Sequence, residues 1–107
     1  MTTIALVDDE SSIRTSVSLA LESEGFKVDV FQNGIEALEA LESKHYDLGL
    51  FDIKMPKMDG NELLAKVRSS KNNDLKEMPI IFLTSKDQEQ DEIIGLRMGA
   101  ADYITKP

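Results

Sequence analysis

Several short apolar runs in this sequence end in side chains that could do chemistry together. Asp8 and Asp9 follow one such run, and Asp52, Thr84 and Lys106 follow three others. Three carboxylates held in one crevice repel one another and raise one another's pKa values unless a cation is present. A hard divalent cation with oxygen ligands satisfies such a group, and Mg²⁺ is the ion we expect.

The charges of these side chains suit phosphoryl transfer. One Mg²⁺ and the Lys106 ammonium together neutralise the three aspartates. A neutral, oxygen-rich site with a lysine and a hydroxyl group can stabilise the oxygens of a loose phosphoryl-transfer transition state, and an aspartate can be the nucleophile. Taken singly, each group has an ordinary explanation: acids near a helix start, a β-branched strand residue at Thr84, and a surface charge at Lys106.

Apolar runs predict the strands, and apolar residues at helical spacing between them predict the helices. The predicted strands are residues 4–7, 28–31, 48–51, 80–83 and 103–104. The first helix covers residues 11–24, with Ile13, Val17, Ala20 and Leu21 on its inner face, and the last covers residues 87–98.

Two further helices are predicted from possible caps. Asn33 can cap a helix whose inner face carries Ile35, Leu38 and Leu41. Asp59 can cap the next, and the polar residues 69–77 are expected to form the longest loop.

The alternation of strands and helices predicts parallel strands joined by right-handed crossovers. We therefore expect an α/β fold, a doubly wound parallel sheet of five strands in one domain over residues 1–107. In such sheets ligands bind at the carboxyl ends of the strands, which is where the reactive side chains fall.

Composition excludes several classes of function. The chain has 107 residues and a formal net charge of −8, which disfavours direct binding of nucleic acid or of an anionic membrane. It contains no cysteine, so thiolate chemistry and disulfide scaffolds are excluded. Because there is no long apolar run and no signal-peptide pattern at the N-terminus, a cytoplasmic location is expected.

Four motifs in order resemble the response-regulator receiver domain of two-component signalling. They are Ile4–Glu10, Tyr46–Leu48 with Asp52–Gly60, Leu83–Ser85, and Gly99–Pro107. The resemblance covers the whole chain and is nearest to receivers attached to winged-helix DNA-binding outputs. It implies a flavodoxin-like sheet with strand order 2-1-3-4-5.

The resemblance also implies the role of each site residue. Asp52 would be phosphorylated by a partner histidine kinase, with Lys106 pairing with the phosphoryl oxygens. The Mg²⁺ ligands would be Asp8, Asp9, Asp52 and the backbone carbonyl of Lys54.

On activation, Thr84 would hydrogen-bond a phosphoryl oxygen and Tyr103 would turn inward as the aromatic switch. This would alter the surface of the fourth helix and fifth strand and so control an output, which we expect to be transcriptional. The bond between Lys106 and Pro107 is expected to be cis.

Two features depart from the family pattern. Ala101 stands where many of these receivers have an aspartate, which puts the mode of dimerisation in doubt. The sequence also stops before the family's fifth helix, so we expect a C-terminally truncated receiver that is less stable and tends to oligomerise or swap elements through the uncovered sheet face.

Other functions fit less well. A Mg²⁺-dependent phosphohydrolase of the haloacid-dehalogenase type would need an aspartate where Lys54 stands. A flavodoxin-like cofactor module would bind a flavin phosphate, which the acids after the first strand would repel, and a pseudo-receiver would not need the full set of site residues. His45 is expected to be solvent-exposed. We therefore expect a phosphoacceptor switch that promotes only its own phosphorylation and dephosphorylation.

Overall fold

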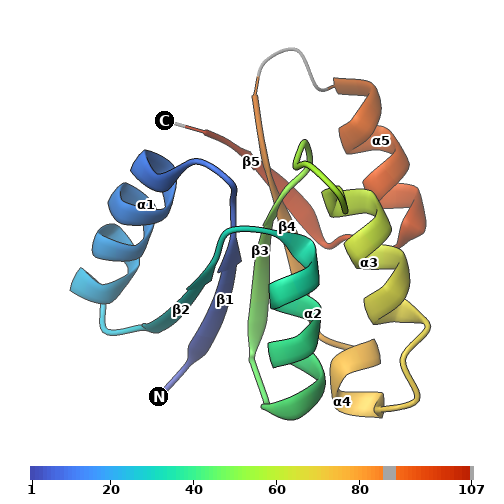
Figure 1. Cartoon of the computed structure of the whole chain (residues 1–107), viewed down its shortest axis with the longest axis horizontal. Helices are drawn as coiled ribbons and strands as arrows, with labels where there is room; N and C mark the ends of the chain where they lie inside the picture. Colours follow the sequence, from blue (N-terminus) through green and yellow to red (C-terminus); the bar gives the residue numbers. More distant parts are fainter. Residues whose placement is uncertain (86–88, 107) are drawn as a thin grey trace.

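A five-stranded parallel sheet forms the centre of the protein. The computed structural model describes residues 1–85 and 89–106, without the side chains of residues 89–92. The strands lie in the order β2-β1-β3-β4-β5 (Figure 1). They are β1 (Thr3–Val7), β2 (Lys27–Phe31), β3 (Leu48–Asp52), β4 (Ile80–Thr84) and β5 (Asp102–Thr105). The predicted doubly wound fold and its strand order are confirmed.

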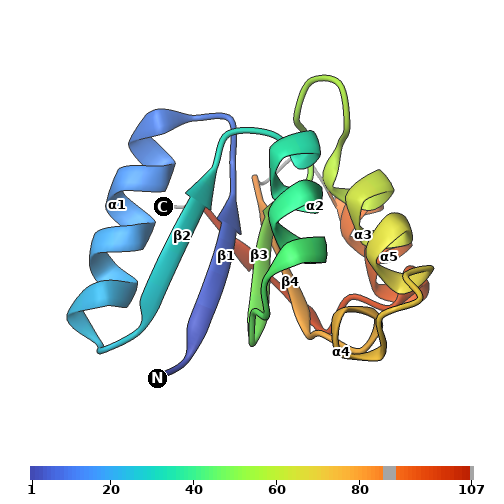
Figure 2. The same cartoon turned by 60° about the horizontal axis from the view of Figure 1, so that its bottom comes forward.

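Helices cover both faces of the sheet (Figures 1 and 2). They are α1 (Ser11–Ser23), α2 (Gly34–Ser43), α3 (Gly60–Arg68), the single turn α4 (Asn73–Lys76) and α5 (Glu89–Met98). One face packs against α1 through Ile13, Val17 and Leu21, and the other packs against α2, α3 and α4. None of the helices in the described part of the chain has the length and apolar character needed to span a membrane.

The central strands are buried on both faces, as their continuous apolar sequences predict. Four consecutive residues of β1, Ile4 to Val7, are at most 1 % exposed, and Phe51 and Phe82 are fully buried in β3 and β4. The two sides of the sheet thereby form two separate apolar clusters. This rigid centre fixes where the residues after β1, β3 and β4 emerge.

Side-chain caps set the starts of α2 and α3 as predicted. Asn33 accepts a hydrogen bond from the backbone N–H of Glu36 at 2.9 Å, and Asp59 accepts one from Glu62 at 2.8 Å. The cap at Asp59 begins α3 directly after the turn that follows Asp52.

Three local predictions were wrong. Ile35 is 51 % exposed, because Gly34, Ala37 and Leu41 define the buried side of α2 and Ile35 lies well round the helix from it. Ala20 is likewise exposed on α1. The loop predicted over residues 69–77 contains α4, which Asn72 caps by accepting from the N–H of Asp74 and which buries Leu75.

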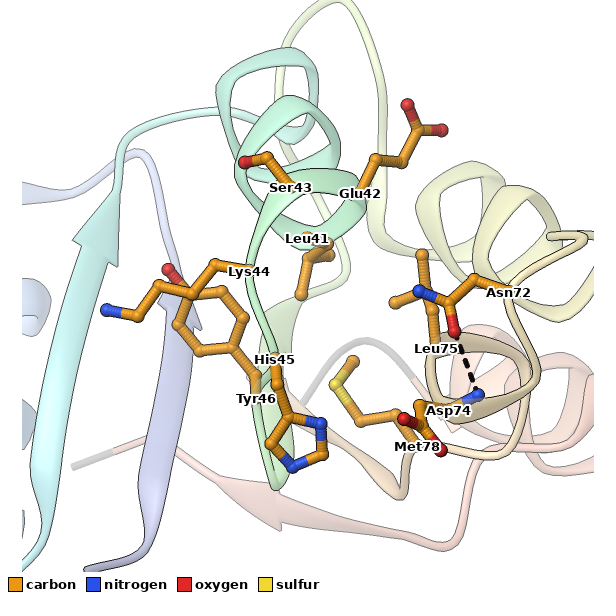
Figure 3. Close-up of a pocket in the computed structure, with 10 residues that line it drawn as sticks. All are labelled: Leu41, Glu42, Ser43, Lys44, His45, Tyr46, Asn72, Asp74, Leu75 and Met78. Carbon is orange, nitrogen blue, oxygen red and sulfur yellow. Dashed lines mark hydrogen bonds between the residues drawn. The ribbon is translucent and has the colours of Figure 1, made fainter.

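A surface pocket of about 140 Å³ lies at the amino ends of β3 and β4 (Figure 3). Its walls come from the end of α2, the residues before β3, and α4, and they include His45, Asp74 and Met78. None of the predicted site residues lines it. His45 is exposed, as expected, and its Nε2 lies 3.1 Å from Asp47 Oδ1.

Candidate functional site

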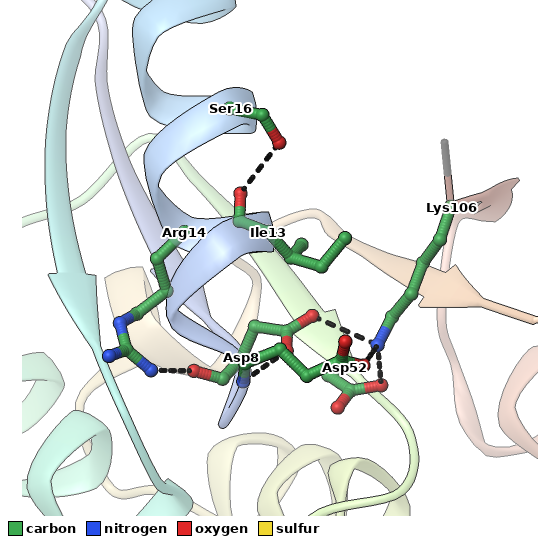
Figure 4. A network of polar contacts seen from close by, with 7 residues as sticks. Asp8, Ile13, Arg14, Ser16, Asp52 and Lys106 are labelled. Atoms are coloured by element: carbon green, nitrogen blue, oxygen red, sulfur yellow. Dashed lines mark hydrogen bonds and ion pairs between the residues drawn. The ribbon is translucent and has the colours of Figure 1, made fainter.

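The carboxyl ends of β1, β3 and β5 bring two acids and a lysine into contact (Figure 4). Lys106 Nζ lies 3.0 Å from Asp52 Oδ1 and 3.1 Å from Asp8 Oδ2. These residues are 44 or more positions apart in the sequence, and only the parallel sheet places them together. The predicted convergence of Asp8, Asp52 and Lys106 is therefore seen in the structure.

The two carboxylates are buried at the floor of this site. The side chain of Asp8 is inaccessible to solvent and that of Asp52 is 1 % exposed. Among the described residues, Asp8 Oδ2 and both carboxylate oxygens of Asp52 lack a hydrogen-bond partner of good geometry. Such oxygens carry a desolvation cost, because water no longer solvates their charge.

The pKa values reflect this burial. Burial, followed by the charge of Asp8, raises the pKa of Asp52 to about 7, although Lys106 acts in the opposite direction. Burial also raises the pKa of Asp8. Burial alone would lower the pKa of the Lys106 ammonium, but its contacts with Asp52 and Asp8 outweigh that effect and raise it. Lys106 therefore keeps its positive charge firmly, whereas burial disfavours the charged forms of Asp8 and Asp52.

Glu10 is a contact that sequence reasoning missed. Its carboxylate Oε1 accepts a hydrogen bond from Lys106 Nζ at 3.2 Å, while its backbone N–H donates to Asp8 Oδ1 at 2.9 Å. The run of three acids was visible in the sequence, but whether Glu10 turned toward Lys106 depended on the conformation after β1.

Two further residues support the acids through the backbone. Arg14 Nη1 donates to the carbonyl oxygen of Asp8 at 2.8 Å. A Cβ at Gly60 would overlap the carbonyl oxygen of Asp52 and would lie 2.9 Å from Ile53 Cα. Glycine at position 60 therefore allows the start of α3 to press against the strand end that carries Asp52. The sequence signal for it was the Asp-Gly pair after the turn.

The remaining predicted site residues lie in different surroundings. Thr84 is fully buried at the end of β4, and its hydroxyl has no hydrogen-bond partner among the described residues. Tyr103 lies on β5 with 42 % of its surface exposed. Lys54 is exposed in the turn after β3. The predicted cis bond between Lys106 and Pro107 lies outside the described residues.

The donor set fits a hard cation. Asp8, Asp9 and Glu10 can each offer a carboxylate oxygen within 4.8 Å of the others, and oxygen donors of this kind are the ones that Mg²⁺ prefers. The structure groups Glu10 with Asp8 and Asp9, whereas the sequence grouped Asp52 with them. Asp52 is joined to this group by the lysine that it shares with Asp8 and Glu10.

Comparison with protein families identifies a family whose members have an acidic site of this kind. The family model of the response regulator receiver domain matches residues 4–107. The chain belongs to this family. Receiver domains are signalling modules of two-component systems that interact with histidine kinases and bind Mg²⁺ at an acidic site.

Curated relatives are transcriptional regulators. The chain is 42 % identical over 104 residues to the alkaline phosphatase synthesis transcriptional regulatory protein PhoP of Bacillus subtilis. It is also 42 % identical over 104 residues to the transcriptional regulatory protein DltR of Streptococcus agalactiae. Each match covers 97 % of this receiver but only 42 % and 45 % of the relative, so the chain spans less than half the length of these proteins.

Solved receiver structures share the fold. The chemotaxis protein CheY4 of Vibrio cholerae superposes with a TM-score of 0.90 at 33 % identity, over 100 % of this chain and 88 % of that one. The receiver domain of a sensor histidine kinase from Pseudomonas aeruginosa superposes with a TM-score of 0.88 at 31 % identity, over 99 % and 85 %. In that structure a magnesium ion is coordinated in the active site cleft.

Proposed function

We propose that Asp52 of this receiver accepts a phosphoryl group from a phosphohistidine of a partner histidine kinase. The observation that supports this most strongly is the buried Asp52 carboxylate, which sits beside Asp8 and 3.0 Å from Lys106. A carboxylate that is buried beside a second carboxylate is poorly solvated and is therefore a better nucleophile than one in water.

In the proposed step, one carboxylate oxygen of Asp52 forms a bond to phosphorus while the phosphorus–nitrogen bond of the donor breaks. The bonding electron pair leaves with the imidazole nitrogen. Lys106, which in the resting site contacts Asp52, is placed to neutralise the phosphoryl oxygens as the group transfers. Hydrolysis of the acyl phosphate by water then releases inorganic phosphate and returns Asp52 to its carboxylate.

Mg²⁺ would be held by Asp8, Asp9, Asp52 and the backbone carbonyl of Lys54, with Glu10 close to the same group. When bound, it supplies positive charge that neutralises the acids and the incoming phosphoryl oxygens. The buried oxygens of Asp8 and Asp52 support this assignment, because Lys106 is their shared ion-pair partner and the cation would add a second positive charge.

Phosphorylation would then change the surface of α5 and β5. The Thr84 hydroxyl is buried and has no hydrogen-bond partner among the described residues, so it is available to donate to a phosphoryl oxygen. Tyr103, on the neighbouring strand, is exposed enough to turn inward when Thr84 moves. Because the curated relatives are transcriptional regulators, we propose that this surface controls a transcriptional output, through a linked output domain or a second copy of the receiver.

The competing function is a Mg²⁺-dependent phosphohydrolase with Asp52 as its nucleophile. Incubation with Mg²⁺ and a small acyl phosphate separates the two, because both the covalent label and the released phosphate can be counted. A switch takes up a single label per chain and releases phosphate no faster than its label decays. Sustained turnover of a phosphate ester would instead support the hydrolase.

A further inference from the structure

We infer that Arg68 is a positioning residue for Lys106, because it anchors the start of the strand that ends at that lysine. This inference rests on the proposed function of the site. Arg68 is the last residue of α3 and lies at the opposite end of β5 from Lys106. It would act through the backbone and would touch none of the reacting atoms.

The Arg68 guanidinium joins three segments through backbone carbonyls. Nη1 donates to the carbonyl oxygens of Lys76 at 2.9 Å and Met78 at 2.8 Å, and Nη2 donates to that of Gly99 at 2.7 Å. Lys76 ends α4, Met78 leads into β4, and Gly99 forms the turn between α5 and β5. One side chain thereby fixes the entries of β4 and β5 relative to α3.

The strand that Arg68 anchors, β5, buries none of its side chains. Every residue of β5 is exposed, with Tyr103 at 42 % and Ile104 at 51 %, and the strand lies at the edge of the sheet. Its position comes from its pairing with β4, together with two flanking backbone hydrogen bonds: Ala101 N–H to the Ile80 carbonyl at 2.8 Å and Lys106 N–H to the Thr84 carbonyl at 2.6 Å. A strand without buried side chains gains little from apolar burial, so contacts at its two ends add to the stability that the β4 pairing provides.

Both ends of β5 are held by a cation. Lys106 holds the carboxyl end through its contacts with Asp8, Asp52 and Glu10, and Arg68 holds the amino end through Gly99. The fit at the amino end is close: Gly99 has a φ of +111°, and a Cβ there would lie 3.1 Å from Arg68 Nε. A lysine could not reproduce this arrangement, because it lacks the planar fork of donors that reaches several carbonyls at once.

Loss of the Arg68 contacts at the amino end of β5 would also make the position of Lys106 at its carboxyl end less fixed. If β5 frays or shifts, Lys106 spends less time at its 3.0 Å contact with Asp52, and the developing charge on the phosphoryl group is neutralised less well. Catalytic geometry is sensitive to such shifts, since a displacement of about 1 Å can cost up to roughly a hundredfold in rate. Mg²⁺ affinity should not fall, because displacement of Lys106 removes a competing positive charge from Asp8 and Asp52.

The test compares Arg68→Met and Arg68→Lys with wild type and with Leu41→Val, a truncation of a buried side chain on α2. Three quantities are measured: the rate of labelling by a small acyl phosphate with saturating Mg²⁺, the affinity for Mg²⁺, and hydrogen exchange of the β5 amides. Urea unfolding identifies which variants are equally destabilised.

We expect Arg68→Met to be labelled about tenfold more slowly than wild type, with β5 amides exchanging faster and with Mg²⁺ affinity no weaker than that of wild type. Arg68→Lys should fall between the two, and Leu41→Val should be labelled at the wild-type rate. Should Arg68→Met fail to fold, Arg68→Lys decides the question through the same measurements.

Equal labelling rates for wild type and the folded Arg68 variants would overturn the inference, as would an equal slowing in Leu41→Val at matched stability. An unlabelled wild-type protein would instead refute the proposed function. Hydrogen exchange of the β5 amides measures whether Arg68 holds the strand, whether or not wild type is labelled.

Discussion

Replacement of Asp52 by asparagine should make the metal-free protein more stable at neutral and alkaline pH. The carboxylate is 1 % exposed, lies beside Asp8, and has no hydrogen-bond partner of good geometry on either oxygen among the described residues. The charge of Asp52 therefore lowers the free energy of unfolding. The proposed function needs this charge, but the fold does not.

The magnitude follows from the pKa. Burial and the neighbouring Asp8 raise the pKa of Asp52 from 3.8 to about 7. At about 1.4 kcal/mol per unit, ionisation of Asp52 in the native state costs on the order of 4 kcal/mol. Asparagine removes this cost but leaves a buried amide that is incompletely hydrogen-bonded, which costs about 1–3 kcal/mol. We expect a net gain of about 1–3 kcal/mol in the free energy of unfolding.

The direction in which stability changes with pH follows from the raised pKa of Asp52. Because the folded pKa of Asp52 lies above its unfolded value, the wild-type protein is free of this cost below about pH 4, and loses stability as the pH rises toward about 7. Asp52→Asn lacks this loss. By the same arithmetic, Asp52→Asn should be less stable than wild type by about 1–3 kcal/mol in acid, gain relative to wild type between these pH values, and be the more stable protein at higher pH by a constant amount.

The assay is urea unfolding of both proteins in a chelator across this pH range, with Asp29→Asn as a control of opposite sign. Hydrogen bonds from Lys44 and Tyr46 lower the pKa of Asp29. Its contribution to stability is therefore present above its unfolded pKa and is lost as the pH falls through the folded one, so Asp29→Asn should destabilise the protein at about pH 8. Equal or lower stability of Asp52→Asn at that pH would refute the reasoning.

Three further outcomes are expected. Tyr46→Phe, which loses the hydrogen bond from the Tyr46 hydroxyl to Asp29 Oδ2 at 2.7 Å, should lower the free energy of unfolding by about 1 kcal/mol; an unchanged urea midpoint would contradict this. Gly60→Ala should slow labelling of Asp52 and lower the thermal midpoint, because its Cβ would displace the backbone at Asp52. The 107-residue chain should self-associate through the exposed surface of β5, and sedimentation showing only monomer at high concentration would count against that expectation.

Much of the fold was predictable because its signals are local. The continuous apolar runs of β1, β3 and β4 distinguish central strands, and the caps at Asn33 and Asp59 mark the starts of α2 and α3. Right-handed connection of parallel strands then limits the possible topologies. From the sequence alone, these signals predict that Asp8, Asp52, Thr84 and Lys106 lie at one edge of the sheet.

What the sequence did not reveal depends on side-chain direction and on distant contacts. Ile35 looked like a core residue by spacing, but the buried side of α2 runs through Ala37 and Leu41. Nothing in the local sequence shows that Glu10 turns toward Lys106, or that Arg68 reaches the carbonyls of three other segments. Such contacts form only after the chain has folded, so periodicity and motifs do not encode them.

The central claim is that Asp52 is the phosphoacceptor of this receiver. Its most direct test is the intact mass of wild type and Asp52→Asn after treatment with Mg²⁺ and a small acyl phosphate, followed by mapping of the labelled peptide. We predict one added phosphoryl group on wild type, carried by the peptide that contains Asp52, and none on the variant. A label of equal extent on Asp52→Asn, or on a peptide that does not contain residue 52, would contradict the account.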